Sequence, residues 1–340
     1  MEIKLLQQNF QSAWDQYVLQ HSQSEIYHLS AWQQVFHKHG LKTFYVYAQQ
    51  EKNIVGVLPL VLSKSLLFGN FITSVPFYNY SGILANSANV AQLLYQKAQE
   101  IAQQHGAKHI ELRHTTPVLP DIESHQQKVR MLLELPESSD MLWDNFKSKL
   151  RSQIRRAMKE DMKCVTGGVT LLDDFYRVFA INMRDLGTPV WPKSLFRAVF
   201  TYFPENTHIC CVYHKDKVVA AGFLLGFRHT LEIPSASSLR KYNSLSPNML
   251  LYWNVLKFAC EKNYRFFDFG RSSRDSGPHR FKKQWGAAEV PLNWQYWLAD
   301  GNLPQLNPQS KKFQMAISMW KKLPVGLANI IGPFISLKLP

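Results

Sequence analysis

Apolar and polar positions in the first 136 residues switch between helical and strand spacing. Apolar residues recur at helical spacing over residues 9–20, a short helix is expected between Ser30 and Gly40, and Ser87 and Gly106 bound a longer helix. TFYVYAQ and NIVGVLPLVLS, joined by the polar QQEKN, predict a β-hairpin. KHIELRH and VRMLLELP predict two more strands. This half of the chain therefore predicts an α/β layer.

The second half follows a similar order of elements. It predicts helices over 140–160, 173–186 and 247–262, and a hairpin over 208–227 that turns at His214–Lys217. HTLEIPSASS, YRFFDFG and PLNWQYWLA predict further strands. The repeated order predicts an α/β fold of the α+β type, built from two structurally related halves. We expect domains at 1–136 and 137–300, followed by a tail at 301–340.

Composition narrows the class of partner. Apolar residues make up 46% of the 340 residues, which excludes a disordered chain, and the formal net charge is +14. Such a surface favours anionic partners, whether nucleic acid, nucleotide-sugar, acyl-CoA or an acidic membrane face. The four cysteines lack CxxC spacing, which fits a reduced compartment.

The two ends of the chain bear on localisation. The first residues lack a signal-peptide pattern, and no apolar run reaches the ~18 residues that a membrane-spanning helix needs. We therefore expect a cytoplasmic protein. The tail, 301–340, has five lysines, no acidic residue and a plausible amphipathic helix, KKFQMAISMWKK. It is either an interfacial segment on the inner face of an anionic membrane or a brace across the two domains.

Motifs for nucleotide-binding loops, metalloproteases and nucleophile elbows are missing from the sequence, and no metal site is expected. Residues 147–163 instead carry seven Lys or Arg against two acids. Arg151 and Arg155 share one helix face, and Arg155 can bind phosphate oxygens. The alternative is a solvated basic surface.

A second candidate is the turn in LRKYNSLSPNMLLYW. Ser246, Pro247 and Asn248 open a helix whose first backbone N–H groups can bind phosphate or carboxylate. Arg240 and Tyr242 precede this turn. Simple acetyltransferases hold the CoA pyrophosphate at such a turn with glycines, which are missing here; an ordinary capped helix is the alternative.

The strongest candidate is FDFGRSSRDSGPHRFKKQWG, residues 267–286. Asp268 lies in mid-strand between aromatic residues, and Arg271 follows in what we expect to be a loop. Lys282 lies in the same segment, close to the aromatic Trp285. Such a loop at a strand end can bind a ligand or stabilise charge on an acyl carbonyl; a structural loop with a buried Asp–Arg pair is the alternative.

A weaker candidate is VPFYNYSGILA, residues 75–85, in which Asn79 and Tyr80 can line a sugar or peptide pocket. An edge strand followed by a turn is the alternative.

Several of these segments together resemble the FemAB-like proteins of exosortase/PEP-CTERM systems, within the Fem branch of GNAT-fold acyltransferases. The most specific are VAAGFLLGF, LEIPSASSLRKYNSLSPNMLLYW and FFDFGRSSRDSGPHRFKKQWGAAEVPLNWQYWL. The resemblance covers most of the chain and implies two tandem GNAT-like domains with mixed central sheets. It also implies Lys282 at the catalytic centre, through the element FKKQWG, and Tyr252 near the donor. The coiled-coil arm of tRNA-binding relatives has no counterpart here.

The resulting hypothesis is transfer of an acyl or aminoacyl group to an amine or hydroxyl of a cell-envelope precursor, exopolysaccharide or exported protein. The donor is acyl-CoA or aminoacyl-tRNA, used as a co-substrate, with no permanent cofactor. Ser246 and Asn248, helped by Arg240, would hold the donor phosphates and Lys282 would stabilise the oxyanion. Asp268 is either a general base or the partner that positions Arg271. The competing hypothesis is a non-catalytic module that binds a glycan or anionic precursor.

Overall fold

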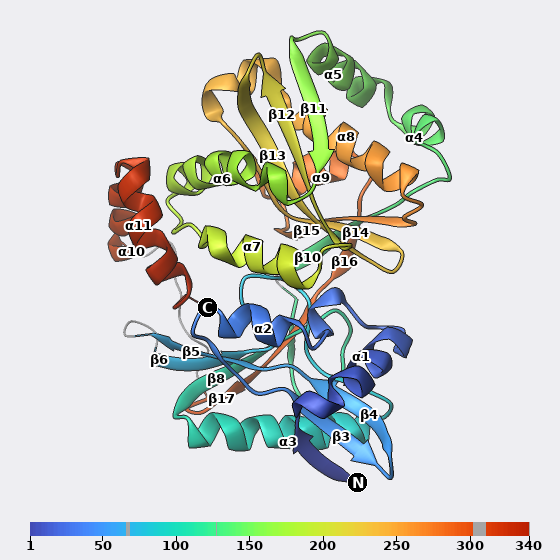
Figure 1. Cartoon of the computed structure of the whole chain (residues 1–340), viewed down its shortest axis with the longest axis vertical. Helices are drawn as coiled ribbons and strands as arrows, with labels where there is room; N and C mark the ends of the chain where they lie inside the picture. The colour runs from blue at the N-terminus through green and yellow to red at the C-terminus, as the bar shows by residue number, and fades with distance from the viewer. Residues whose placement is uncertain (66–68, 127, 302–310, 340) are drawn as a thin grey trace. The chain divides into compact units, whose positions relative to one another are not determined.

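The computed structural model describes residues 1–65, 69–126, 128–301 and 311–339. The chain forms two compact units, each assembled from separate stretches of sequence (Figure 1). Unit 1 comprises Met1–Lys128, Pro291–Leu306 and Leu337–Pro340, and unit 2 comprises Val129–Val290 and Asn307–Ser336. These limits differ from the expected boundaries at 136 and 300. The strand at 128–134 joins the sheet of unit 2, and the strand at 293–298 joins a sheet of unit 1. Residues 302–310 of the expected tail lie outside the described residues.

Unit 1 contains two sheets and three α-helices. The four-stranded sheet has the order β1-β3-β4-β7, and the six-stranded sheet has the order β2-β5-β6-β8-β17-β9. The strands are β1 (Glu2–Leu5), β2 (Lys42–Thr43), β3 (Val46–Gln50), β4 (Asn53–Leu58), β5 (Val61–Ser65), β6 (Gly69–Thr73), β7 (Leu84–Ala85), β8 (Ala107–His114), β9 (Ser124–His125) and β17 (Asn293–Leu298). The helices are α1 (Gln11–Gln20), α2 (Trp32–His37) and α3 (Ala88–Gln104).

Unit 2 is built on one seven-stranded sheet with the order β11-β12-β13-β14-β15-β10-β16. Its strands are β10 (Lys128–Glu134), β11 (Met162–Gly167), β12 (Thr207–His214), β13 (Lys217–Phe227), β14 (Thr230–Ser238), β15 (Phe266–Ser273) and β16 (Ala288–Pro291). Its helices are α4 (Ser139–Asn145), α5 (Ser148–Met158), α6 (Leu172–Leu186), α7 (Lys193–Tyr202), α8 (Pro247–Glu261), α9 (Gly277–Gln284), α10 (Lys311–Lys321) and α11 (Val325–Ser336). No helix in the described part of the chain has both the length and the apolar character needed to cross a bilayer.

Local signals explain why most predicted elements are present. Ser87 caps α3 by accepting a hydrogen bond from the Val90 N–H (3.3 Å), and Gly106 follows the helix with a φ of 58°. Two predictions need correction. The strand expected over 53–63 is divided at Pro59 into β4 and β5, which join different sheets, and the helix expected over 140–160 is broken between α4 and α5.

Each unit contains a pair of parallel neighbouring strands joined through a helix. In unit 1, β6 pairs with β8, and the last register pair is Thr73 with Glu111. In unit 2, β14 pairs with β15, and the last register pair is Glu232 with Asp268. An acidic residue therefore ends the pairing on the second strand in both units. This correspondence agrees with the predicted internal repeat.

In unit 1, a buried loop continues along β8 beyond that last pair. The backbone N–H of Ser74 donates to the Glu111 carbonyl (3.0 Å), and that of Ser81 donates to the Arg113 carbonyl (2.8 Å). Asn79 and Tyr80 lie in this loop, and both are buried. The segment is thus largely a packed loop, and its last two residues form β7, the edge strand of the four-stranded sheet.

Two buried histidines of unit 1 are held in the neutral form. Burial lowers the pKa of His28 to about 4 and that of His114 to about 3. The backbone N–H of Ile83 donates to His114 Nε2 (2.9 Å), so this nitrogen carries no proton. Gly82 (φ 127°) lies so close that a Cβ on it would be 2.2 Å from His114 Cδ2. The His114 ring is thus packed directly against the backbone of residues 82 and 83.

These histidines predict a loss of stability in mild acid. Below about pH 6.5 these two histidines bind protons in the unfolded chain but stay neutral in the folded chain. The free energy of unfolding therefore falls toward pH 4. The slope is up to about 1.4 kcal/mol per pH unit for each group. Denaturant unfolding at pH 7, 6 and 5 measures this slope. His114→Gln should flatten it, whereas His229→Gln, at an exposed position, should not; equal slopes in both variants would contradict this explanation.

Candidate functional site

The candidate site begins where β14 and β15 stop pairing. Their register ends at Glu232 with Asp268, yet β14 continues to Ser238 and β15 to Ser273. Beyond Glu232, β14 remains paired with β13 on its other side, up to Ser238 with Ala220. The inner edges of β14 and β15 are therefore free of each other along their C-terminal halves.

Asp268 is the most deeply buried charge at this point, with an exposed fraction of 0%. Its Oδ2 accepts a hydrogen bond from Arg130 Nε (2.6 Å), and its Oδ1 accepts one from the backbone N–H of Gly270 (2.7 Å). Arg130 of β10, which the sequence did not predict to be part of the site, thus lies at ion-pair distance from Asp268. Both carboxylate oxygens therefore accept hydrogen bonds.

Lys282 lies over the same strand end. Its Nζ donates to the carbonyl oxygens of Gly270 (3.1 Å) and Arg271 (2.8 Å), and only 8% of the residue is exposed. Burial lowers the pKa of Lys282 to about 8, while the charges of Asp268 and Glu232 act in the opposite direction. A lysine with this pKa changes its protonation state near neutral pH.

Lys282 is carried by a helix, which corrects the predicted loop. Residues 277–284 form α9, because Ser276 caps the helix by accepting from the His279 N–H (3.2 Å) and Pro278 lies in its first turn. Ser276, Gly277 and Pro278, which lie in the segment expected to be a loop, are therefore the start of a helix.

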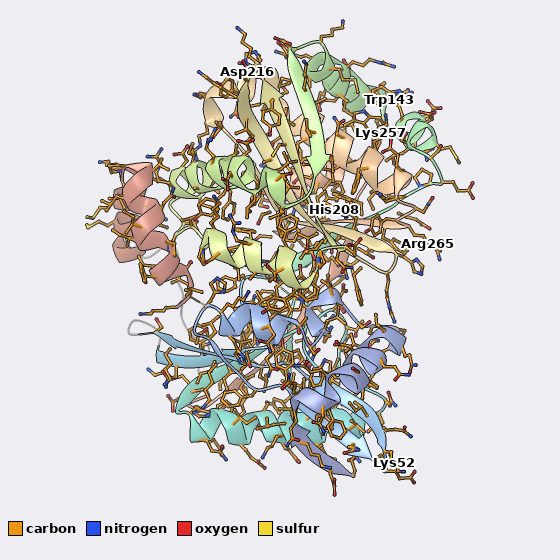
Figure 2. All side chains as sticks on the ribbon, viewed as in Figure 1. Lys52, Trp143, His208, Asp216, Lys257 and Arg265 are labelled. Carbon is orange, nitrogen blue, oxygen red and sulfur yellow. The ribbon has the colours of Figure 1, made fainter. Side chains whose placement is uncertain are left out.

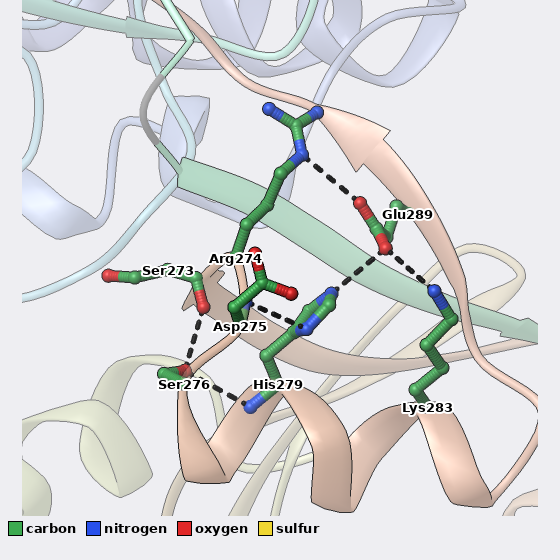
Figure 3. A network of polar contacts seen from close by, with 7 residues as sticks. All are labelled: Ser273, Arg274, Asp275, Ser276, His279, Lys283 and Glu289. Atoms are coloured by element: carbon green, nitrogen blue, oxygen red, sulfur yellow. Dashed lines mark hydrogen bonds and ion pairs between the residues drawn. The ribbon is translucent and has the colours of Figure 1, made fainter.

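Glu289 on β16 holds α9 in place (Figure 3). Its carboxylate lies 2.9 Å from His279 Nε2 and 3.2 Å from both Arg274 Nε and Lys283 Nζ. The backbone N–H of Asp275 donates to His279 Nδ1 (3.2 Å), which places the ring proton on Nε2, toward Glu289. Hydrogen bonds from the lysine and arginine lower the pKa of Glu289 to about 2. The carboxylate therefore stays charged and links both ends of α9 to the sheet.

An aromatic cluster packs on the other side of this region. Tyr252 of α8 stacks on Phe269 of β15 (ring centroids 5.5 Å apart) and meets Phe281 and Trp285 edge-on or tilted. Burial raises the pKa of Tyr252 well above its usual range, so its hydroxyl stays protonated. Trp285, 1% exposed, is part of the core. Tyr252 and Trp285 thus pack together against Phe269 of β15, the strand that carries Asp268.

The turn before α8 differs in detail from the prediction. The helix starts at Pro247 as expected, but Ser246 has a left-handed backbone (φ 56°), and its side chain makes no capping hydrogen bond. Arg240 and Tyr242 belong to a short 3-10 helix, Arg240–Leu245. The Arg240 guanidinium donates to the Asp185 carbonyl (3.0 Å), and Lys241 Nζ lies 4.9 Å from the Tyr242 ring. Asn248 lies in the first turn of α8.

The remaining predicted residues lie on other elements or in the other unit. Arg155 is exposed on α5, with its guanidinium 5.2 Å from the ring centre of Trp143 (Figure 2). Arg271 is exposed on β15, although its carbonyl binds Lys282. Asn79 and Tyr80 belong to unit 1. Across the described residues there is no group of three or more His, Cys, Asp or Glu side chains that could hold a metal ion.

Comparison with known proteins agrees with this architecture. Residues 144–283 match the family described as Acetyltransferase (GNAT) domain, and no curated protein matches the chain. The structure of FemX aligns with a TM-score of 0.68 at 15% identity, covering 91% of this chain and 100% of that one. A tandem GNAT protein from the clavulanic acid biosynthesis pathway aligns with a TM-score of 0.54 at 13% identity, covering 88% and 98%.

A third similar structure is the C-terminal domain of a putative lysylphosphatidylglycerol synthetase from Agrobacterium fabrum. Its TM-score is 0.57 at 10% identity, with 86% of this chain and 92% of that one covered. At these identities the likeness establishes the fold, a mixed α/β architecture of GNAT domains in tandem. Together with the domain match, it identifies an acyltransferase, as predicted.

The buried pair of Arg130 and Asp268 yields a stability prediction. Removing one partner leaves an uncompensated buried charge, so Arg130→Met should lower the free energy of unfolding by about 3–5 kcal/mol. The double variant Arg130→Met/Asp268→Leu should recover part of this loss. Denaturant unfolding measures each change.

The matched control is the exposed pair Lys257–Glu261 on α8 (3.8 Å; Lys257 is labelled in Figure 2). Lys257→Met should change the free energy of unfolding by less than about 1 kcal/mol. A similar small effect of Arg130→Met would show that the buried pair does not hold this strand end.

Proposed function

We propose that this acyltransferase is Fem-like and moves an acyl or aminoacyl group from an activated donor to an amine or hydroxyl of a cell-envelope precursor. The observation that carries this proposal is Lys282, buried and bound to the carbonyls of Gly270 and Arg271 where β14 and β15 have separated. We include the exosortase/PEP-CTERM-associated type in the proposal because the motif segments resemble it.

Lys282 has the donor geometry that an oxyanion needs. An ammonium group has three N–H donors, and two of them go to the carbonyls of β15. The third can donate to the oxygen that becomes negative when the acceptor attacks the acyl carbonyl. The acceptor's nitrogen or oxygen bonds to the carbonyl carbon, and its proton passes to a base or water. The bond from the carbonyl carbon to the donor's sulfur or oxygen breaks, and that atom leaves with the bonding electron pair. Such a charge-assisted donor strengthens as the negative charge develops.

The donor is proposed to bind at unit 2 because the inner edges of β14 and β15 are released there. In unit 1 the corresponding position is filled by the buried loop 74–83, which stays hydrogen-bonded to β8. The Arg113 guanidinium also closes that position, since it donates to Glu111 Oε1 and to the Tyr78 carbonyl, both at 2.5 Å. In the described part of unit 2, no corresponding hydrogen-bonded loop lies between β14 and β15 beyond Glu232 and Asp268.

The remaining predicted residues fit an anionic donor. The first-turn N–H groups of α8 after Pro247, with Asn248 and the nearby Arg240 and Lys241, suit phosphates of acyl-CoA or of the terminal nucleotide of aminoacyl-tRNA. Arg155 would add a phosphate contact farther along a long donor. An envelope precursor as acceptor would bring the enzyme to the inner face of the cytoplasmic membrane.

The test of function is a donor screen followed by a single substitution. The protein is incubated with a panel of acyl-CoAs and charged tRNAs, and bound donors are detected by native mass spectrometry. With the donor found and an amine acceptor, Lys282→Ala should lower kcat by about 10²–10³, the usual cost of one oxyanion donor. Lys257→Ala, at an exposed lysine of α8, should keep the wild-type rate; unchanged turnover in Lys282→Ala would refute the oxyanion role.

The lowered pKa of Lys282 predicts an alkaline limit to activity. The ammonium form is needed, so kcat should fall about tenfold per pH unit above a pKa near 8 instead of near 10.5. In Lys282→Arg the guanidinium keeps its proton throughout this range, and the alkaline limb should disappear even if the rate is lower. Rate profiles from pH 6 to 10 provide the measurement. An identical alkaline limb in both proteins would assign it to another group.

A further inference from the structure

The two C-terminal helices of unit 2 form a hairpin with two different faces. α10 and α11 both contact α6 (Figure 1). The Arg184 guanidinium donates to the Leu323 carbonyl in the turn between α10 and α11 (2.7 Å). On α11 the inner face is buried at Ala328, Gly332 and Ser336, spaced four residues apart. The hairpin is therefore fixed to unit 2 through small residues.

The outer face of the same hairpin is apolar and exposed. On α11, Leu327, Ile330, Ile331 and Phe334 are exposed by 42%, 66%, 37% and 69%, at the spacing of one helix face. On α10, Met315 and Met319 are exposed by 65% and 66%. We call these six side chains the apolar ridge. Large apolar groups gathered in this way mark an interaction surface rather than ordinary surface scatter.

The charge around the apolar ridge indicates what covers it. Lys321 and Lys322 are exposed at the turn between the helices and Lys338 is exposed after α11, while residues 301–340 contain no acidic side chain. Apolar side chains whose own segment carries lysines and no acidic residue suit a surface that is apolar below and negative above, which is an anionic bilayer. The whole chain, at +14, would be drawn toward the same surface.

The length of α11 decides how such a helix would meet the bilayer. Its 12 residues extend ~18 Å, against ~30 Å for the hydrocarbon core, so it cannot span. A helix fixed on one side to α6 also cannot bury its whole circumference in lipid. We propose that the apolar ridge inserts into the headgroup region of anionic membranes, with α10 and α11 lying along the surface. This inference does not depend on the chemistry proposed for Lys282.

The test is flotation of the full chain with lipid vesicles. The protein should bind vesicles of phosphatidylcholine with about one quarter phosphatidylglycerol, and bind pure phosphatidylcholine at least tenfold more weakly. Ile330→Ser/Phe334→Ser should weaken binding at least tenfold, because both apolar anchors are lost. Lys321→Gln/Lys322→Gln should weaken binding about fivefold per lysine, and added salt should act in the same direction.

Controls separate this surface from others. Leu19→Ser removes a comparably exposed apolar side chain (52%) on α1 of unit 1 and should bind like the wild type. Because the substituted ridge residues are exposed, thermal unfolding should be unchanged in the variants. No binding by the wild type, or equal binding by Ile330→Ser/Phe334→Ser, would overturn the proposal. A concentration-dependent dimer, measured by light scattering and lost in that variant without any vesicle binding, would assign the ridge to a second copy and also overturn it.

Discussion

Unit 2 depends on pairing charges at the place where its sheet opens. Glu232 and Asp268 are both buried in neighbouring strands, and a buried carboxylate is costly unless a cation lies beside it. Arg130 and Lys282 provide the cations, from β10 on one side and α9 on the other. The same contacts fix the backbone of β15, since Asp268 holds the Gly270 N–H and Lys282 holds the next two carbonyls in line. The chemistry assigned to Lys282 is therefore inseparable from the structural demand for charge balance.

The two units show how one scaffold can be kept open or closed. Both place an acidic residue at the end of the parallel pairing, Glu111 in unit 1 and Asp268 in unit 2. In unit 1 the acid pairs with Arg113 on its own strand, and the chain that follows β6 fills the space. In unit 2 the acid pairs with Arg130, which comes from another strand, β10. The position is thus packed by the chain itself in unit 1, whereas in unit 2 the edges of β14 and β15 are free of each other beyond Asp268.

The sequence predicted what local chemistry determines. The start of α8 at Pro247, the caps of α3 and the hairpin of β12 and β13 follow from short-range signals, and the structure contains them. Lys282 was found through a motif, and Asp268 through its odd place in an apolar strand. A comparable signal exists for Arg130, which is the lone arginine in the predicted strand VRMLLELP and has apolar neighbours.

Other features could not be predicted because they depend on distant residues. Arg130 and Asp268 are 138 positions apart, and nothing in either segment names the other as partner. The helix α9 was mistaken for a loop because glycine, serine and proline mark both turns and helix starts, and only the contacts of Glu289 with Arg274, His279 and Lys283 distinguish the two. Pro59 falls inside the predicted strand because the run of apolar residues continues on both sides of it.

The return of β17 to unit 1 has a consequence for biosynthesis. This strand lies between β8 and β9, and Gln295 fills the hydrogen-bonding needs of the Leu119 backbone from 176 residues away. A ribosome delivers the chain from its N-terminus, so the sheet of unit 1 stays incomplete until almost the whole of unit 2 has been made. During that interval β8 presents an unpaired edge to the cell. Maturation of the first unit must then wait for the second, which reverses the usual order in which domains emerge and fold.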